Sequence, residues 1–140
     1  MKAKQLVLAM VAGVTFAACG SKKAASIEEL QGEWVVVELN GTAVSDSLEN
    51  TPFLGFEVSE KRLYGNSSCN NLMGTIQTDS LKAGSLSFAS VGSTMMMCPD
   101  MTTEEAMLNA LKSVQAYEVA ADVLTLKDAE GKEVIELKKK

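Results

Sequence analysis

The 140-residue sequence contains no histidine. This absence excludes mechanisms that need an imidazole base, a Ser-His or Cys-His pair, or a histidine-ligated zinc. The S-x-x-K and G-x-S-x-G patterns are also missing, as is a Gly-rich phosphate loop followed by lysine. We therefore expect a protein that is not an enzyme, and we assign no catalytic residue, metal ligand or cofactor.

Aromatic residues are scarce, at 5% of the chain, so the core must be built mostly from aliphatic residues and methionine. Hydrophobic residues make up 46% and charged residues 22%, close to globular averages, which excludes disorder as a description of the whole chain. The length allows one ordinary domain. A formal net charge of −5 argues against a nucleic-acid partner.

The first 18 residues have the layout of a secretory signal peptide. Lys2 and Lys4 give a basic start, residues 6–14 are apolar, and Ala17 and Ala18 precede Cys19. The run is too short and too rich in Gly and Ala for a membrane span. Residues 16–19 resemble a bacterial lipobox, which predicts cleavage before Cys19 and acylation of that cysteine. The alternative is a soluble secreted protein with an incidental cysteine.

Residues 19–29 are predicted to be the lipidated cysteine and a flexible tether, since residues 20–26 are small and polar. Gly20 is not the Asp that, by resemblance to enterobacterial lipoproteins, marks retention in the inner membrane. We expect an outer-membrane lipid anchor with the domain, residues 30–140, facing the periplasm. Two or three acyl chains would hold the protein firmly, because a single chain gives only marginal binding.

The domain reads as β-rich, with turn signals about every ten residues. Asn40-Gly41 suits a type I′ hairpin turn. The last three strands should form a meander. The predicted strands are 34–39, 53–58, 62–66, 74–78, 86–90, 93–97, 117–120, 123–127 and 134–137.

One helix is predicted near residue 102. Thr102 and Glu105 have the spacing of a capping box. An apolar stripe follows at helical spacing and should pack on one side or end of the sheet. The stripe consists of Met107, Ala110, Leu111 and Val114.

Two cysteines remain besides Cys19. In an oxidising compartment, Cys69 and Cys98 are most simply a disulfide. The rival interpretation is redox chemistry, but the pair is not C-x-x-C and no helix start is positioned to lower either pKa.

The run Met95 to Met101 contains four methionines and Cys98. Thioether and thiolate ligands suit Cu(I), which makes a soft-metal site one hypothesis. We favour the simpler interpretation, that these methionines fill irregular gaps in the core.

One set of spaced positions forms a recognisable motif: Gly32, Trp34, Gly65, Cys69, Asn70, Gly74, Thr94, Met96 and Cys98. This set resembles the META domain of HslJ-like bacterial proteins, over residues 30 to 137. Ser68, Met95 and Met107 depart from the usual pattern of that family.

The resemblance implies an α+β fold, a small and mainly antiparallel β-sheet curled into a partly open barrel with one α-helix packed against it. It also implies a disulfide between the matching cysteines and an association with envelope stress or antibiotic tolerance. Our leading hypothesis is a non-enzymatic lipoprotein that binds another envelope component. The alternatives are a carrier of a lipid or small apolar ligand and a Cu(I)-binding protein.

Overall fold

The computed structural model describes residues 26–140. The predicted signal peptide, Cys19 and residues 20–25 of the tether lie outside the described residues. The elements are η1 (Ile27–Leu30), β1 (Gly32–Leu39), β2 (Thr42–Ala43), β3 (Phe53–Glu57), η2 (Val58–Glu60), β4 (Arg62–Asn66), β5 (Asn71–Gln77), β6 (Ser87–Ser93), α1 (Thr102–Ser113), β7 (Ala116–Ala120), β8 (Val123–Lys127) and β9 (Glu133–Lys139).

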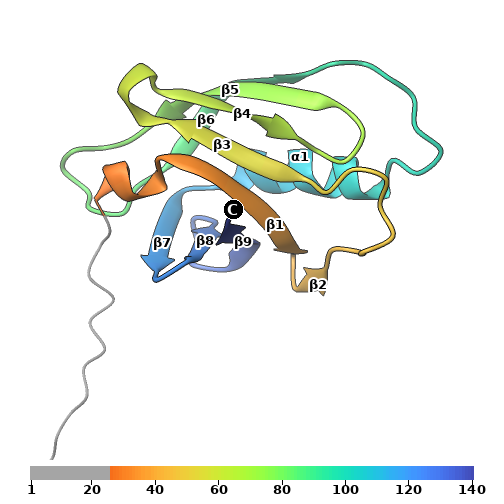
Figure 1. The fold of residues 1–140 in the computed structure, drawn as a ribbon. Coiled ribbons are helices and arrows are strands. Elements are labelled where there is room, and N and C mark those ends of the chain that lie inside the picture. The colour runs from red at the N-terminus through yellow and green to blue at the C-terminus, as the bar shows by residue number, and fades with distance from the viewer. Residues whose placement is uncertain (1–25) are drawn as a thin grey trace, which may run out of the picture.

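The strands form one antiparallel sheet in the order β6-β5-β4-β3-β1-β9-β8-β7, with β2 paired to β1 (Figure 1). The two edges approach each other at one end, where Ser85 bridges to Ala116 and the Leu86 amide donates to the carbonyl of Gln115. Helix α1 connects β6 to β7 and packs against β6, β9 and β1. The sheet is therefore a half-barrel with one helix packed against it, which confirms the predicted fold class.

The core lies between the concave face of the sheet and α1. Met107 and Leu111 are fully buried there, and Val114, just beyond the helix, is 1% exposed. The predicted apolar stripe is thus confirmed. Trp34 and Phe56 are the largest fully buried side chains, and Trp34 Nε1 donates to the carbonyl of Leu30 at 2.9 Å. The indole therefore ties β1 to the short helix that precedes it.

Two local predictions of turns are confirmed. Asn40 and Gly41 have φ of 49° and 80°, as a type I′ turn requires, and they join β1 to β2. The last three strands form the predicted meander, in which Ala121, with φ of 54°, takes part in the turn between β7 and β8.

The predicted capping box is wrong. Thr102 is already the first helical residue, and the N-cap position belongs to Met101, with no side-chain cap hydrogen bond. The Thr102 amide instead donates to Asp100 Oδ1 at 2.9 Å. The spacing matched because Thr and Glu are common in a first helical turn, but the carboxylate of Asp100 satisfies the free amide.

The predicted strand over residues 93–97 is also wrong. β6 runs unbroken from Ser87 and ends at Ser93. Beyond it, the backbone amide of Met96 donates to the side chain of Asn70 at 2.6 Å. The backbone of this segment bonds to a side chain here, and not to a neighbouring strand, so no regular strand forms.

Gly65 on β4 lies against the backbone of β3. A Cβ at this position would be 2.2 Å from the carbonyl oxygen of Phe53, a main-chain atom within the sheet. At Gly92, by contrast, no atom would lie within 4 Å of an added Cβ. Glycine at position 65 is therefore required by close packing of the two strands.

We predict that Gly65→Ala lowers the free energy of unfolding by about 2–3 kcal/mol, because the clash forces β3 and β4 apart. The matched variant Gly92→Ala should change it by less than about 0.5 kcal/mol. Urea unfolding of both variants measures the difference. Equal midpoints for the two variants would contradict the prediction.

Candidate functional site

Five of the family-motif residues gather at one end of the sheet, where the turn between β4 and β5 (residues 67–70) meets the segment after β6. They are Cys69, Asn70, Thr94, Met96 and Cys98. We call residues 94–101 the Met segment. A disulfide joins Cys69 in the turn to Cys98 in this segment, across 29 positions of sequence, as predicted. Closing a loop of this length stabilises the fold by roughly 3.6 kcal/mol in the chain-entropy model. The bond leaves neither sulfur free as a thiolate.

Asn70 is 2% exposed, and both polar atoms of its side chain make hydrogen bonds within the protein. Its Oδ1 accepts from the hydroxyl of Thr94 at 2.9 Å and from the amide of Met96 at 2.6 Å. Its Nδ2 donates to the carbonyl of Met96 at 3.1 Å and to Glu104 Oε2 at 2.9 Å. One side chain thus fixes the start of the Met segment and α1 to the same turn.

Glu104 on α1 is 3% exposed and faces the same turn. Its Oε1 accepts from the hydroxyl of Ser67 at 2.6 Å and from the amide of Asn70 at 3.0 Å. Burial acts to raise the pKa of this carboxyl group, but the hydrogen bonds from Ser67 and Asn70 together outweigh it, so the pKa lies below its ordinary value of 4.5. Glu104 is therefore a buried carboxylate balanced by donors rather than by a cation.

Three of the four methionines of the Met segment face solvent, whereas Met101, next to α1, is half-buried. Met95, Met96 and Met97 are 95%, 57% and 89% exposed. The favoured interpretation, that they fill gaps in the core, is wrong, because the inward-facing space at this end is taken by Asn70 and the disulfide. Three neighbouring apolar side chains therefore project from a segment that is held by a covalent bond and by hydrogen bonds.

The other motif residues lie elsewhere in the sheet, away from this cluster, and have structural roles. Gly32 begins β1, with φ of 110°, and Trp34 is in the core. Gly65 and Gly74 lie on β4 and β5, where Gly74 leaves room for the side chain of Val91. The motif thus brings together Asn70, Thr94, Met96 and the two cysteines, whereas its glycines and Trp34 serve packing.

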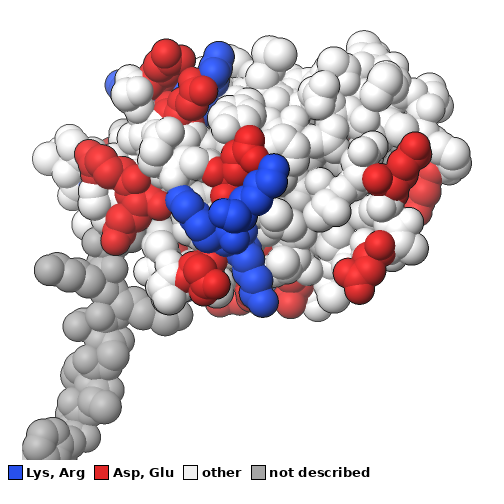
Figure 2. All heavy atoms as spheres, viewed as in Figure 1, with Lys and Arg blue, Asp and Glu red and all other residues white. Residues whose placement is uncertain are grey.

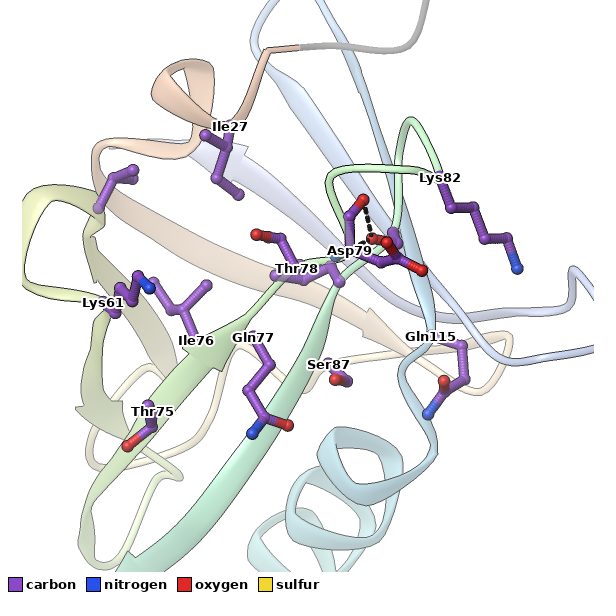
Figure 3. Close-up of a pocket in the computed structure, with 13 residues that line it drawn as sticks. Ile27, Lys61, Thr75, Ile76, Gln77, Thr78, Asp79, Lys82, Ser87 and Gln115 are labelled. Atoms are coloured by element: carbon purple, nitrogen blue, oxygen red, sulfur yellow. Dashed lines mark hydrogen bonds between the residues drawn. The ribbon is translucent and has the colours of Figure 1, made fainter.

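A second feature is a pocket of about 740 Å³ at the other end of the molecule, where the sheet edges meet. Ile76 and Leu86 form its buried floor, and Lys61 and Lys82 are among its walls (Figure 3). Sequence reasoning missed this pocket, because its lining comes from η1, η2, β5, the segment before β6 and Gln115, which are distant in the sequence.

Charge is unevenly distributed over the surface. Figure 2 shows Lys and Arg side chains gathered around the C-terminal strand, among acidic ones. There Lys140 pairs with Glu33 at 2.7 Å, and Lys139 lies 4.5 Å from the centre of the Trp34 ring. Residues 90–105, which include the Met segment, contain no Lys or Arg. The exposed methionines therefore lie in a neutral to acidic part of the surface.

Within residues 26–140, no group of three or more His, Cys, Asp or Glu side chains is placed to hold a metal ion. In the same part of the chain, no helix has both the length and the apolar character needed to cross a bilayer.

We predict that Glu104→Gln lowers the free energy of unfolding by about 2 kcal/mol at neutral pH, because the amide turns a donor toward Ser67 and Asn70, which are themselves donors. The carboxylate's contribution is complete above pH 4.5 and is lost as the pH falls through the lower pKa of the folded state. The gap between wild type and variant should therefore narrow below pH 4.5 in denaturation series measured at several pH values. Glu105→Gln, at the exposed neighbouring position, is the control, and an equal effect of both variants would refute the role of Glu104.

Comparison with known proteins places this geometry in a family. The META domain family model matches residues 25–140. No curated protein gives a significant match. A protein solved by NMR is 26% identical, with a TM-score of 0.63, over 81% of this chain and 94% of that one.

Two further structures show the same fold. A protein from Burkholderia xenovorans, solved by NMR, is 21% identical with a TM-score of 0.63, over 81% of this chain and 85% of that one. A DUF4847 family protein from Bacteroides vulgatus, solved by crystallography, is 18% identical with a TM-score of 0.59, over 82% and 98%. Because the family model spans the whole described region, the chain belongs to the META domain family, which is not a known enzyme family.

Proposed function

We propose that this protein is a non-enzymatic cell-envelope lipoprotein whose META domain binds another envelope protein through the Met segment, and so supports tolerance of envelope stress. The observation that carries the proposal is the exposure of Met95, Met96 and Met97 on a fixed segment. Methionine is a flexible and polarisable side chain, and exposed methionines are common on binding surfaces that adapt to a partner. Fixing the backbone beforehand lowers the entropy lost on binding.

The chemistry of this surface favours a protein partner over a membrane. Asp100 lies in the Met segment and Glu105 just beyond it, with no Lys or Arg between residues 90 and 105. An anionic lipid surface would repel such a segment, because membrane association needs basic residues beside the apolar ones. A partner with an apolar pocket and a neutral or basic rim fits it.

The position of the Met segment supports the same choice. The described chain begins at η1, at one end of the domain, while the segment between β6 and α1 lies at the opposite end (Figure 1). If Cys19 carries the anchor, only the short tether separates η1 from the outer membrane. The Met segment then lies at the end of the domain that is farther from the anchor, where another protein can reach it.

Neither alternative gains comparable support. For a lipid or small apolar ligand, the concave face of the sheet is filled by buried side chains of the sheet, such as Trp34 and Phe56, and of α1, such as Leu111. For Cu(I), the bond between Cys69 and Cys98 removes the thiolate, so a site would rest on thioethers alone.

The anchor is tested by Cys19→Ala in the full-length protein. We predict that the unchanged protein is found in the outer-membrane fraction and incorporates labelled palmitate, and that the variant does neither, because acyl chains provide the hydrophobic attachment. Cys69→Ala is the matched control and should leave labelling unchanged. Palmitate-free wild-type protein in the soluble fraction would show that the lipobox interpretation is wrong.

The binding surface is tested by photo-crosslinking in living cells. We predict that a photoreactive amino acid at position 97 forms an adduct with one envelope protein, whereas the same group at Leu81 forms none. Leu81 is a suitable control because it is 95% exposed, like Met97 at 89%. It belongs to the connection between β5 and β6, which lies at the η1 end of the domain, opposite the Met segment (Figure 1).

The partner identified in this way is then purified and its affinity measured. Replacing Met95, Met96 and Met97 together with serine should weaken binding at least tenfold, because a few central side chains supply most of the energy of an interface. Leu81→Ser should not change the affinity. Adducts to lipid only, or an unchanged affinity of the triple variant, would overturn the proposal.

A further inference from the structure

The side chains that an oxidant can reach are concentrated in the Met segment. Met95 and Met97 are 95% and 89% exposed, and Met96 between them is 57% exposed. Met107, by contrast, is a fully buried core residue of α1. A thioether sulfur is soft and polarisable, and it is oxidised to a sulfoxide when an oxidant reaches it. Three consecutive exposed methionines therefore form one accessible target on the surface.

Most other oxidisable side chains of the described residues are protected. Cys69 and Cys98 are bonded to each other, so no thiol is left among the described residues to react first. Trp34 and Tyr117 are 1% and 4% exposed, and the sequence contains no histidine. Met73, a single residue on β5, is 61% exposed. We therefore expect oxidation of the folded protein to fall on methionines, and mainly on those of the Met segment.

An electrophilic oxidant such as a hypohalous acid matches this site, because it reacts with soft sulfur. With hypochlorous acid, the methionine sulfur gains a bond to oxygen and loses two electrons. The O–Cl bond breaks, chlorine is reduced to chloride, and one proton is released to water. Residues 90–105 contain no lysine, so neither the segment nor its flanks in the chain carry an amine that consumes the oxidant.

Oxidation of these three side chains leaves the core untouched. Asn70 accepts from the amide of Met96 at 2.6 Å and donates to its carbonyl at 3.1 Å, and the disulfide adds a covalent link. The three exposed methionines belong neither to the hydrophobic core nor to the residues packed against it. An oxygen added to any of these sulfurs is therefore accommodated in solvent, while the backbone stays in place.

The sulfoxide changes what the surface can bind. Oxidation converts a flexible apolar side chain into a polar one with a hydrogen-bond acceptor. An apolar pocket that accepts a thioether would have to remove water from this oxygen without offering it a donor, which costs free energy. The same fixed segment is thus an apolar surface when reduced and a polar one when oxidised.

From these observations we infer that Met95, Met96 and Met97 are a site of oxidation by hypohalous acid, and that their oxidation releases the protein bound at the Met segment. The inference rests on the proposed function, since it assigns a control to the binding surface proposed there. The partner is held while the thioethers are intact and is lost once they are sulfoxides.

The site is tested by treating the full-length protein with increasing amounts of hypochlorous acid and mapping its peptides by mass spectrometry. We expect Met95 and Met97 to be converted at least about tenfold faster than Met107, because reactivity follows exposure. The midpoint of urea unfolding should not change while only exposed methionines are oxidised. Equal conversion of exposed and buried methionines would overturn the inference.

The effect on binding is tested with a variant that keeps an apolar surface but has no thioether there. It combines Met95→Leu, Met96→Leu and Met97→Leu, and its ligand is the partner captured by crosslinking at position 97. Hypochlorous acid should weaken binding by the wild type at least about tenfold and leave the affinity of the leucine variant unchanged. Met73→Leu is the matched control, and it should lose affinity as the wild type does.

The outcomes separate this inference from the proposed function. If the untreated wild type binds no partner at the Met segment, the proposed function fails and the inference fails with it. If it keeps full affinity while mass spectrometry shows the three sulfoxides, the inference alone fails. An equal loss of affinity in the leucine variant would also overturn the inference, because the oxidant would then act elsewhere.

Discussion

The buried pair of Asn70 and Glu104 is the constraint on which one end of this fold depends, the end where the β4–β5 turn meets the Met segment. A carboxylate at 3% exposure is costly unless donors surround it, and here Ser67 and Asn70 supply them all. Those donors are in position only when the turn between β4 and β5 is formed. The start of α1 is therefore fixed by the sheet, and the helix that follows packs against β6, β9 and β1.

The same turn explains why methionines are displayed at the surface. Asn70 holds both the amide and the carbonyl of Met96, so the backbone of the Met segment is bound from the inside. Its side chains have no inward space left and project into solvent. A segment fixed in this way presents an apolar surface without the loss of conformational freedom that a mobile loop would suffer on binding.

Much of the fold follows from local sequence patterns. The sequence predicts the Asn40-Gly41 turn and the apolar stripe of α1, because both depend on residues that are close together in the chain. It also predicts the pairing of Cys69 with Cys98, because these are the two cysteines that remain besides Cys19. The burial of Glu104 is not predicted, since a glutamate in a first helical turn is usually solvated beside the helix dipole. Its partners lie more than thirty positions away, and only the folded sheet brings them together.

The exposure of the methionines and the existence of the pocket were not predicted, for related reasons. Three adjacent methionines look like core residues until the structure shows that a polar side chain occupies the space beneath them. The pocket exists only because the segment before β6 reaches the residue before β7, a closure between residues 86 and 115 that no periodic pattern reveals. Long-range register is the information that local patterns lack.

Two links of different chemistry hold the Met segment to the same turn, and this has a physical consequence. The disulfide depends on an oxidising environment, whereas the hydrogen bonds of Asn70 to Thr94 and Met96 join neutral groups, and only its bond to Glu104 involves a carboxylate. Reduction leaves the Asn70 contacts in place, and acid leaves the disulfide intact. A change in one condition therefore removes one link only, and the segment keeps its position at the surface under conditions that would release a loop held by either link alone.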